Sequence, residues 1–247
     1  MPYNMPDKEA AMTTLQLLGN ACTLLSAPDG TRIVSDPYGE NRPPGLAPLP
    51  PGLKADAVTV SHVHPDHNNT AAVGGTTSSA PRILTEPGTY RVGGVWVTGW
   101  ASREGSPHGP SELRNVIFIF EAAGVKIVHM GDGGIIAEPE IRTAVSGADV
   151  VLVNIDGYVL PLDRLMEEMD ALKARTIIPT HFSVSAVNRW ATEETYTLDE
   201  YLTSLPAGIV KKRMTRGEIE VNPGMPRQVA GLPYTLIYSN SSDSSAE

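Results

Sequence analysis

Residues 57–67 constrain this chain most, because a short apolar run there is followed at once by a dense group of potential metal ligands. Residues 57–60 have the β-branched, apolar composition of a short buried strand. Four ligand-type side chains follow within six positions: His62, His64, Asp66 and His67. Residues two apart in an extended segment point to the same side, so His62 and His64 can converge on one point. After Pro65 the chain turns, and Asp66 and His67 can address a second point nearby.

Imidazole and carboxylate groups are the ligands of catalytic zinc, iron and manganese sites. Half of the six histidines in the 247-residue chain fall in this segment, so it indicates a metal site rather than ordinary surface histidines at a strand end.

The run His62-x-His64-x-Asp66-His67 after a hydrophobic strand resembles the signature of the metallo-β-lactamase superfamily. Further short matches are spread along the chain: Leu18-Gly19-x-Ala21, Asp36-Pro37, Gly131-Asp132 and Pro179-Thr180-His181. Together they most resemble the branch related to ascorbate-6-phosphate lactonase. The resemblance implies a mixed α/β (α+β) fold, an αββα sandwich over roughly residues 13–238, with metal ligands on loops at one edge.

The resemblance also implies how the ligands are shared between two metals. His62 and His64 begin the first site, and Asp66, His67 and His181 form the second. Asp132 supplies the carboxylate that bridges both. Without the resemblance, Gly131-Asp132 is an ordinary turn sequence, because Gly-Asp pairs are common in turns.

The third protein ligand of the first site departs from the family pattern, which usually has a histidine after a strand equivalent to residues 95–98. Glu104 stands close to the expected position, whereas His108 is the only histidine available. We favour His108 slightly for its chemistry, with a solvent-exposed loop residue as the alternative. Glu104 would add a hard oxygen ligand and shift the preference toward manganese or iron. In a third interpretation neither residue binds, and only one metal is held firmly.

Three further polar residues are candidates for supporting the site. His129 precedes Gly131-Asp132 and either orients Asp132 by a hydrogen bond or is a core histidine. Asn20 and Asp36 either hydrogen-bond near the metals or serve as turn and cap residues.

Runs of strands followed by alternating helices and strands favour two sheets with helices outside. Strands are predicted at residues 14–18, 21–26, 31–35, 83–84, 89–92, 95–98, 116–121, 125–130, 149–154, 175–179, 208–212, 217–221 and 233–238. Helices are predicted at residues 68–73, 138–145, 162–172 and 197–205. Residues 41–52 and 99–115 are predicted to be irregular loops, the first being either a wall of the substrate pocket or a surface connection.

Composition narrows the functional classes. The formal net charge of −9 argues against a nucleic-acid partner held by phosphate contacts. No apolar run approaches 18 residues, so no membrane span is expected. The single Cys22 and the absence of a secretory signal favour the cytoplasm. Residues 1–12 are predicted to be a leader, and residues 239–247 a disordered tail. A homo-oligomer is compatible with the sequence.

The predicted chemistry is hydrolysis by metal-bound hydroxide, because a divalent cation lowers the pKa of bound water toward 7. Two divalent ions are expected, zinc first, with manganese or iron as alternatives. Asp66 is the candidate catalytic residue, orienting the water and passing its proton to the leaving group. The expected substrate is a small-molecule lactone, ester or phosphate ester. The competing hypothesis is a non-catalytic metal-binding or ligand-sensing domain of the same fold.

Overall fold

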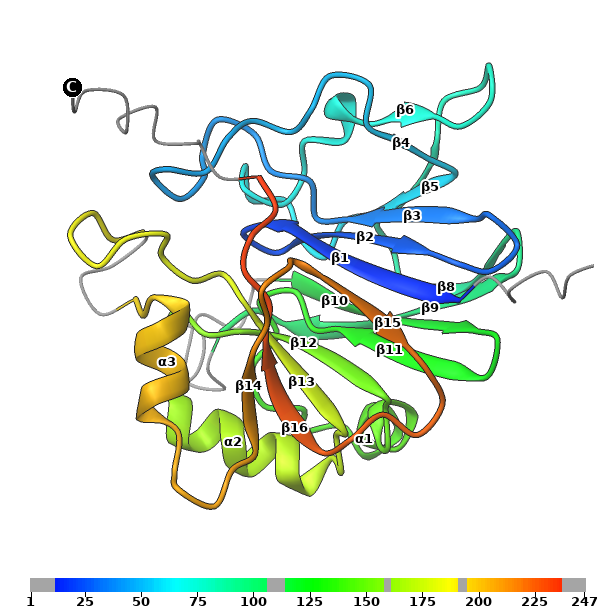
Figure 1. The fold of residues 1–247 in the computed structure, drawn as a ribbon. Coiled ribbons are helices and arrows are strands. Elements are labelled where there is room, and N and C mark those ends of the chain that lie inside the picture. Colours follow the sequence, from blue (N-terminus) through cyan, green and yellow to red (C-terminus); the bar gives the residue numbers. More distant parts are fainter. Residues whose placement is uncertain (1–11, 106–113, 158–160, 191–194, 237–247) are drawn as a thin grey trace, which may run out of the picture.

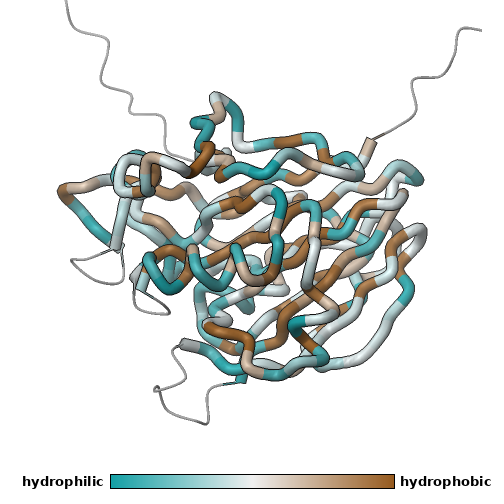
Figure 2. The backbone as a smooth tube through the Cα atoms, turned by 90° about the horizontal axis from the view of Figure 1, so that it is seen from below, coloured by the Kyte–Doolittle hydropathy of each residue, from teal (hydrophilic) through white to brown (hydrophobic). Residues whose placement is uncertain are grey.

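Two β-sheets packed face to face form the centre of the fold (Figure 1). The computed structural model describes residues 12–105, 114–157, 161–190 and 195–236. Hydrophobic segments run along the strands of both sheets (Figure 2). Buried side chains of both sheets, such as Leu17 and Val58 of one and Ile117 and Leu152 of the other, belong to one hydrophobic core.

The first sheet has six strands in the order β15-β1-β2-β3-β5-β7. Its strands are β1 (Thr13–Gly19), β2 (Cys22–Ser26), β3 (Arg32–Ser35), β5 (Ala57–Thr59), β7 (Arg82–Leu84) and β15 (Glu218–Val221). Strands β2 and β3 form an antiparallel hairpin, and β3, β5 and β7 are parallel. The four ligand-type residues His62, His64, Asp66 and His67 come directly after β5, so they lie at the edge of the sheet where the parallel strands have their carboxyl ends.

The second sheet has eight strands in the order β14-β16-β13-β12-β11-β10-β9-β8. Its strands are β8 (Gly88–Val92), β9 (Val95–Arg103), β10 (Arg114–Ala122), β11 (Val125–His129), β12 (Val150–Asn154), β13 (Thr176–Thr180), β14 (Lys211–Arg213) and β16 (Gln228–Gly231). The pairs β8–β9, β9–β10 and β10–β11 are antiparallel, whereas β11, β12 and β13 are parallel to one another. The carboxyl ends of these parallel strands meet at one edge, which brings Asp132 and His181 together.

The described helices lie against the eight-stranded sheet (Figure 1). They are α1 (Pro139–Val145), α2 (Leu162–Ala171) and α3 (Leu198–Ser204). Leu165, Met169 and Leu172 recur at helical spacing and are buried, so the apolar face of α2 covers the sheet. None of the described helices has the length and apolar character needed to cross a membrane.

The outer side of the six-stranded sheet is covered by the segment between β3 and β7 rather than by an α-helix (Figure 1). This segment contains the paired short strands β4 (Lys54–Ala55) and β6 (Gly74–Gly75), and the 3-10 turn η1 (Thr70–Ala72). Leu46, Leu49 and Leu53 are buried there. The proline-rich residues 41–52 therefore mainly cover the sheet.

The predicted mixed α/β sandwich is confirmed, and most of the predicted strands and helices have counterparts within a few residues. Three predictions were wrong. Residues 99–115 are not an irregular loop throughout, because β9 continues to Arg103 and β10 begins at Arg114. The last strand among the described residues is β16, and residues 233–236 of the strand predicted at 233–238 are not in a strand. The helix predicted at 68–73 is only the short turn η1.

Candidate metal centre

The first group of potential ligands consists of His62, His64 and Glu104. Their ligand atoms lie within 4.8 Å of one another. His62 Nε2 is 3.1 Å from His64 Nδ1, which in turn is 3.3 Å from Glu104 Oε1. The two histidines follow β5, whereas Glu104 directly follows β9 and is bridged to Gly133. Strand β9 runs to Arg103 rather than ending at the predicted residue 98, and this extension places Glu104 beside His64.

The second group consists of Asp66, His67 and His181. Asp66 Oδ2 lies 3.1 Å from His181 Nε2 and 3.3 Å from His67 Nε2. His181 follows β13 with a φ of 60°, a left-handed conformation uncommon for residues other than glycine. Its backbone N–H donates to the carbonyl of Asn20, so a contact between the two sheets holds this turn.

Asp132 lies between the two groups and forms a third group with His62 and His67. Its Oδ2 is 3.7 Å from His62 Nε2 and 3.6 Å from His67 Nε2. Gly131 precedes it with a φ of 57°, and a Cβ at that position would collide with Ser61 and Asn115. Glycine is therefore required to turn the chain and place Asp132 here.

Hydrogen bonds from neighbouring amides hold the carboxylates in position. Asn154 Nδ2 donates to Asp132 Oδ1 at 2.8 Å, and Asn20 Nδ2 donates to Asp66 Oδ2 at 3.2 Å. The backbone N–H of Asp132 donates to Asn115 Oδ1 at 3.2 Å. The hydrogen bond expected from Asn20 is thus present.

Asp36 is fully buried and holds both His67 and the start of the ligand loop. Its Oδ2 accepts from His67 Nδ1 at 2.9 Å and from Ser61 Oγ at 2.6 Å, and its Oδ1 accepts from the Ser61 N–H at 2.7 Å. Because Nδ1 of His67 is engaged with Asp36, Nε2 is the nitrogen that faces Asp66 and Asp132. Asp36 therefore supports the site rather than only a turn.

Of the two interpretations of His129, the structure supports the core histidine and not the residue that orients Asp132. His129 Nε2 lies 2.9 Å from the carbonyl of Ala21, and the Gly131 N–H donates to its Nδ1 at 3.2 Å. Its side chain is buried between the sheets, so it is a core histidine with partners.

Sequence reasoning missed Asn115, Asn154 and Asp156. Asp156 Oδ2 lies 3.4 Å from His181 Nδ1 and accepts from Asn154 Nδ2 at 3.2 Å. Asn154 ends β12, the strand between β11 and β13 in the parallel part of the sheet. The sequence did contain a signal for Asn154 and Asp156. They are polar residues at the carboxyl end of β12, and the strands on either side of β12 are followed by the predicted ligands Asp132 and His181.

The carboxylates and imidazoles shift one another's proton affinities. Burial, with the positive charge of His67, lowers the pKa of His62 to about 4. Burial opposes the charge on His67, but the carboxylates of Asp132, Asp36 and Asp66 hold its pKa well above the usual value. Burial alone would raise the pKa of Asp36, yet the hydrogen bond from His67 and neighbouring imidazoles lower it to about 2. Burial raises the pKa of Glu104.

These features fit a bound cation. His67 Nε2 is buried and has no hydrogen-bond partner among the described residues, although it faces the carboxylates of Asp66 and Asp132. A buried polar atom without a partner is costly, and crowded buried carboxylates need positive charge. A divalent cation would satisfy both requirements with the ligand types that zinc, manganese and iron accept.

Of the residues predicted from the sequence, the structure brings together His62, His64, Asp66, His67, Asp132 and His181, with Glu104 beside them. His108, the favoured completion of the first site, lies outside the described residues.

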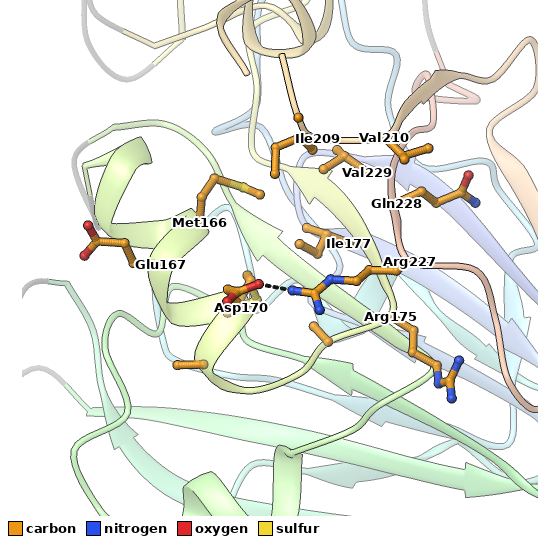
Figure 3. Close-up of a pocket in the computed structure, with 14 residues that line it drawn as sticks. Met166, Glu167, Asp170, Arg175, Ile177, Ile209, Val210, Arg227, Gln228 and Val229 are labelled. Carbon is orange, nitrogen blue, oxygen red and sulfur yellow. Dashed lines mark hydrogen bonds and ion pairs between the residues drawn. The ribbon is translucent and has the colours of Figure 1, made fainter. Parts of the chain in front are cut away.

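Two cavities differ in their relation to this cluster. One of about 720 Å³ opens against His62, His64 and Glu104. Another of about 500 Å³ lies between α2, β13 and β16, where an ion pair joins Arg227 and Asp170 (Figure 3). Its lining contains no histidine, so the first cavity is the one suited to a substrate.

Comparison with known proteins gives a consistent relationship. The family model for a beta-lactamase superfamily domain matches residues 14–181. A UPF0173 metal-dependent hydrolase from Cupriavidus taiwanensis is 28% identical, covering 68% of this chain and 73% of the relative. Another from Methanosarcina barkeri is 27% identical over 72% of this chain and 86% of the relative.

Solved structures agree with these sequence matches. A crystal structure from Thermotoga maritima, described as a Zn-dependent hydrolase of the metallo-β-lactamase superfamily, has a TM-score of 0.68 and 26% identity. The match covers 89% of this chain and 98% of that chain. A metallo-hydrolase from Ignicoccus hospitalis, at 18% identity and a TM-score of 0.56, shares the fold.

Proposed function

Because this chain belongs to the metallo-β-lactamase superfamily and is a metal-dependent hydrolase, we propose that it binds two divalent cations at the candidate centre. We further propose that it hydrolyses a small-molecule lactone, ester or phosphate ester there. The observation that carries the proposal is the position of Asp132, whose carboxylate lies between the two ligand groups within 3.7 Å of His62 and 3.6 Å of His67.

In this proposal His62, His64 and Glu104 hold one cation, and Asp66, His67 and His181 hold the other, with Asp132 shared. Divalent cations at such ligands lower the pKa of water and polarise the bond to be cleaved. Each set mixes two imidazoles with carboxylate oxygens, which suits zinc and also manganese or iron. Because Glu104 offers an oxygen in place of a third imidazole, the first site favours manganese or iron more than a three-histidine site would.

Asp66 is the proposed proton acceptor. Asn20 and His181 fix its Oδ2 by contacts of 3.2 and 3.1 Å, and Asn41 Nδ2 lies 3.5 Å from its Oδ1. Burial alone would raise the pKa of this carboxyl, but contacts with His181 and His67 hold it well below its usual range, so it stays ionised at neutral pH. An oriented, ionised carboxylate can accept a hydrogen bond from water and transfer its proton to the leaving group.

The finer assignments are also part of this proposal. The motif pattern supports a relationship with the lactonase-related branch, a cytoplasmic location is supported by the free buried Cys22, and the net charge of −9 disfavours nucleic acid as a partner.

Replacement of one ligand tests the metal centre directly. His64→Ala should lower the bound metal per chain and the activity on a panel of lactones, esters and phosphodiesters while leaving most of the fold intact. Val63→Ala is the matched control for bound metal only, because Val63 is an exposed neighbour in the same loop without a ligand atom. Elemental analysis and circular dichroism give the readouts. Unchanged metal stoichiometry in His64→Ala would contradict the ligand assignment.

A second pair of variants decides how the first site is completed. Glu104→Gln should release metal and His108→Gln should not, if the Glu104 carboxylate at 3.3 Å from His64 is the ligand. The reverse result would assign the role to His108.

A further inference from the structure

We infer that the substrate carries an apolar segment and an anionic group separate from the bond that is cleaved, and that Arg103 and Arg114 bind this anion beside the metal centre. The reaction in this inference rests on the proposed function, whereas the recognition of the anion is tested without any reaction.

The cavity of about 720 Å³ extends from the first group of metal ligands to Arg114. His62, His64 and Glu104 line it, and so does Arg114, the first residue of β10. A molecule in this cavity would therefore contact the first ligand group and Arg114 together.

The register of β9 and β10 places Arg103 on the same side as Arg114. The two residues are directly opposite each other in the antiparallel pair, as are Ala101 and Val116 two positions along. Directly opposed residues share a face of the sheet, and residues two apart along a strand share it too. Because Arg114, Ala101 and Val116 all line the cavity, Arg103 belongs to the same side.

Two like charges in directly opposed positions destabilise a sheet unless something compensates them. Neither Arg103 nor Arg114 has a carboxylate partner among the residues that the structure describes, and both are exposed. Arg142 and Arg189, by contrast, pair with Glu168 and Glu200. A bound anion would compensate the pair.

The chemistry of two neighbouring guanidinium groups selects the ligand class. Guanidinium groups form forked hydrogen bonds with carboxylate and phosphate oxygens. With a net charge of −9, the protein as a whole repels anions, so an anionic substrate needs local cations near the site. Glu86 also lines the cavity, and its charge disfavours an anion beside it.

The rest of the cavity wall is largely apolar. Val60, Val63, Pro87 and Val116 line it, and Val63 is 82% exposed between the two first-site histidines. An exposed valine at this position favours an apolar segment in the substrate, because burying it stabilises the complex.

A pair of fluorescent probes tests recognition without catalysis. Anilinonaphthalene sulfonate combines apolar rings with a sulfonate, and N-phenyl-1-naphthylamine has the same rings without the charge. The double variant Arg103→Gln/Arg114→Gln should bind the sulfonate about tenfold more weakly or worse. Its affinity for the neutral probe should not change. The charge-matched control Lys212→Gln/Arg216→Gln, at exposed positions on β14 and between β14 and β15, should bind both probes as the wild type does. Equal affinity of wild type and double variant for the sulfonate would overturn the inference.

A matched pair of esters extends the test to the reaction. For 4-nitrophenyl hydrogen adipate, whose acyl chain ends in a carboxylate, the double variant should show a KM raised about tenfold. For neutral 4-nitrophenyl hexanoate, the change in KM should be much smaller. Equal losses on both esters would overturn the inference while leaving hydrolysis in place. If the wild type cleaves neither ester and no member of the lactone, ester and phosphodiester panel, but the probes still discriminate, the proposed function fails and the recognition by the arginines stands.

Discussion

At the scale of single residues, the site depends on how each imidazole is held by a neighbour. Asp36 accepts three hydrogen bonds, two from Ser61 and one from His67 Nδ1. It does so with a φ of 46°, a left-handed conformation that asparagine and aspartate adopt more readily than most residues. The carboxylate therefore links the orientation of His67 to the first turn of the ligand loop.

Asp36→Asn should weaken metal binding about 10- to 100-fold, because the charge is lost and one of the two oxygens, which accept from His67 Nδ1 and from the Ser61 N–H, becomes an NH2 group that cannot accept. The fold should survive, since the amide is the same size and also tolerates the left-handed backbone. Titration of the metal-free protein against a chelator measures the affinity. Asp29→Asn, at the turn between β2 and β3, is the control and should bind metal as the wild type does. An unchanged affinity in Asp36→Asn would show that His67 does not need this partner.

The ligand-type residues were predictable because they lie close together in the sequence or directly follow strands. Most of the residues that hold them by hydrogen bonds were not predictable. Asn154 and Asn115 resemble any polar residue of a strand until the sheet order brings them beside Asp132. The sequence left open whether His129 orients Asp132 or lies in the core, because its place beside Gly131-Asp132 does not reveal that its ring points to Ala21.

At the scale of elements, local signals were strong for helices with clear caps and weak for strands near the site. Helix α3 begins with a capping box in which Thr197 and Glu200 satisfy each other's backbone N–H groups, and residues 197–205 were predicted as a helix with Thr197 as its cap. Residues 99–103 contain Gly99 and mix apolar with polar side chains, so they show no clear alternation of apolar residues. They are nevertheless in β9, because pairing with β10 satisfies their backbone groups.

The start of α3 gives a prediction with a defined pH dependence. Hydrogen bonds from Arg189 and Thr197 lower the pKa of Glu200 from 4.5 to about 2. Its contribution to stability is therefore complete above about pH 5 and is lost as the pH falls toward 2. Glu200→Gln should lower the urea midpoint at neutral pH, and the difference from wild type should shrink across that acidic range. The same change at exposed Glu220 on β15 should have little effect. A difference that is constant with pH would contradict the role of the charge.

At the scale of the whole molecule, the candidate centre joins the two sheets. His62, His64, Asp66 and His67 follow β5 of the six-stranded sheet, whereas Glu104, Asp132 and His181 follow β9, β11 and β13 of the eight-stranded sheet. No local pattern predicts this meeting, because the ligands are separated by long stretches of chain. From the sequence, Asp132 and His181 could be assigned to the site only through the resemblance to a known family.

Removal of metal should therefore lower the stability of the entire domain and not only the activity. A cation bound only by the folded chain adds about 2.7 kcal/mol when its free concentration is 100 times its Kd. Without it, the buried carboxylates of Asp66 and Asp132 depend on proton-bearing imidazoles for compensation. Calorimetry of the protein before chelation, after chelation and after return of zinc or manganese should show a loss and recovery of Tm. His64→Ala should recover less, because one ligand that follows the six-stranded sheet is gone. A Tm that is the same with and without metal would mean that the cluster does not hold the two sheets together.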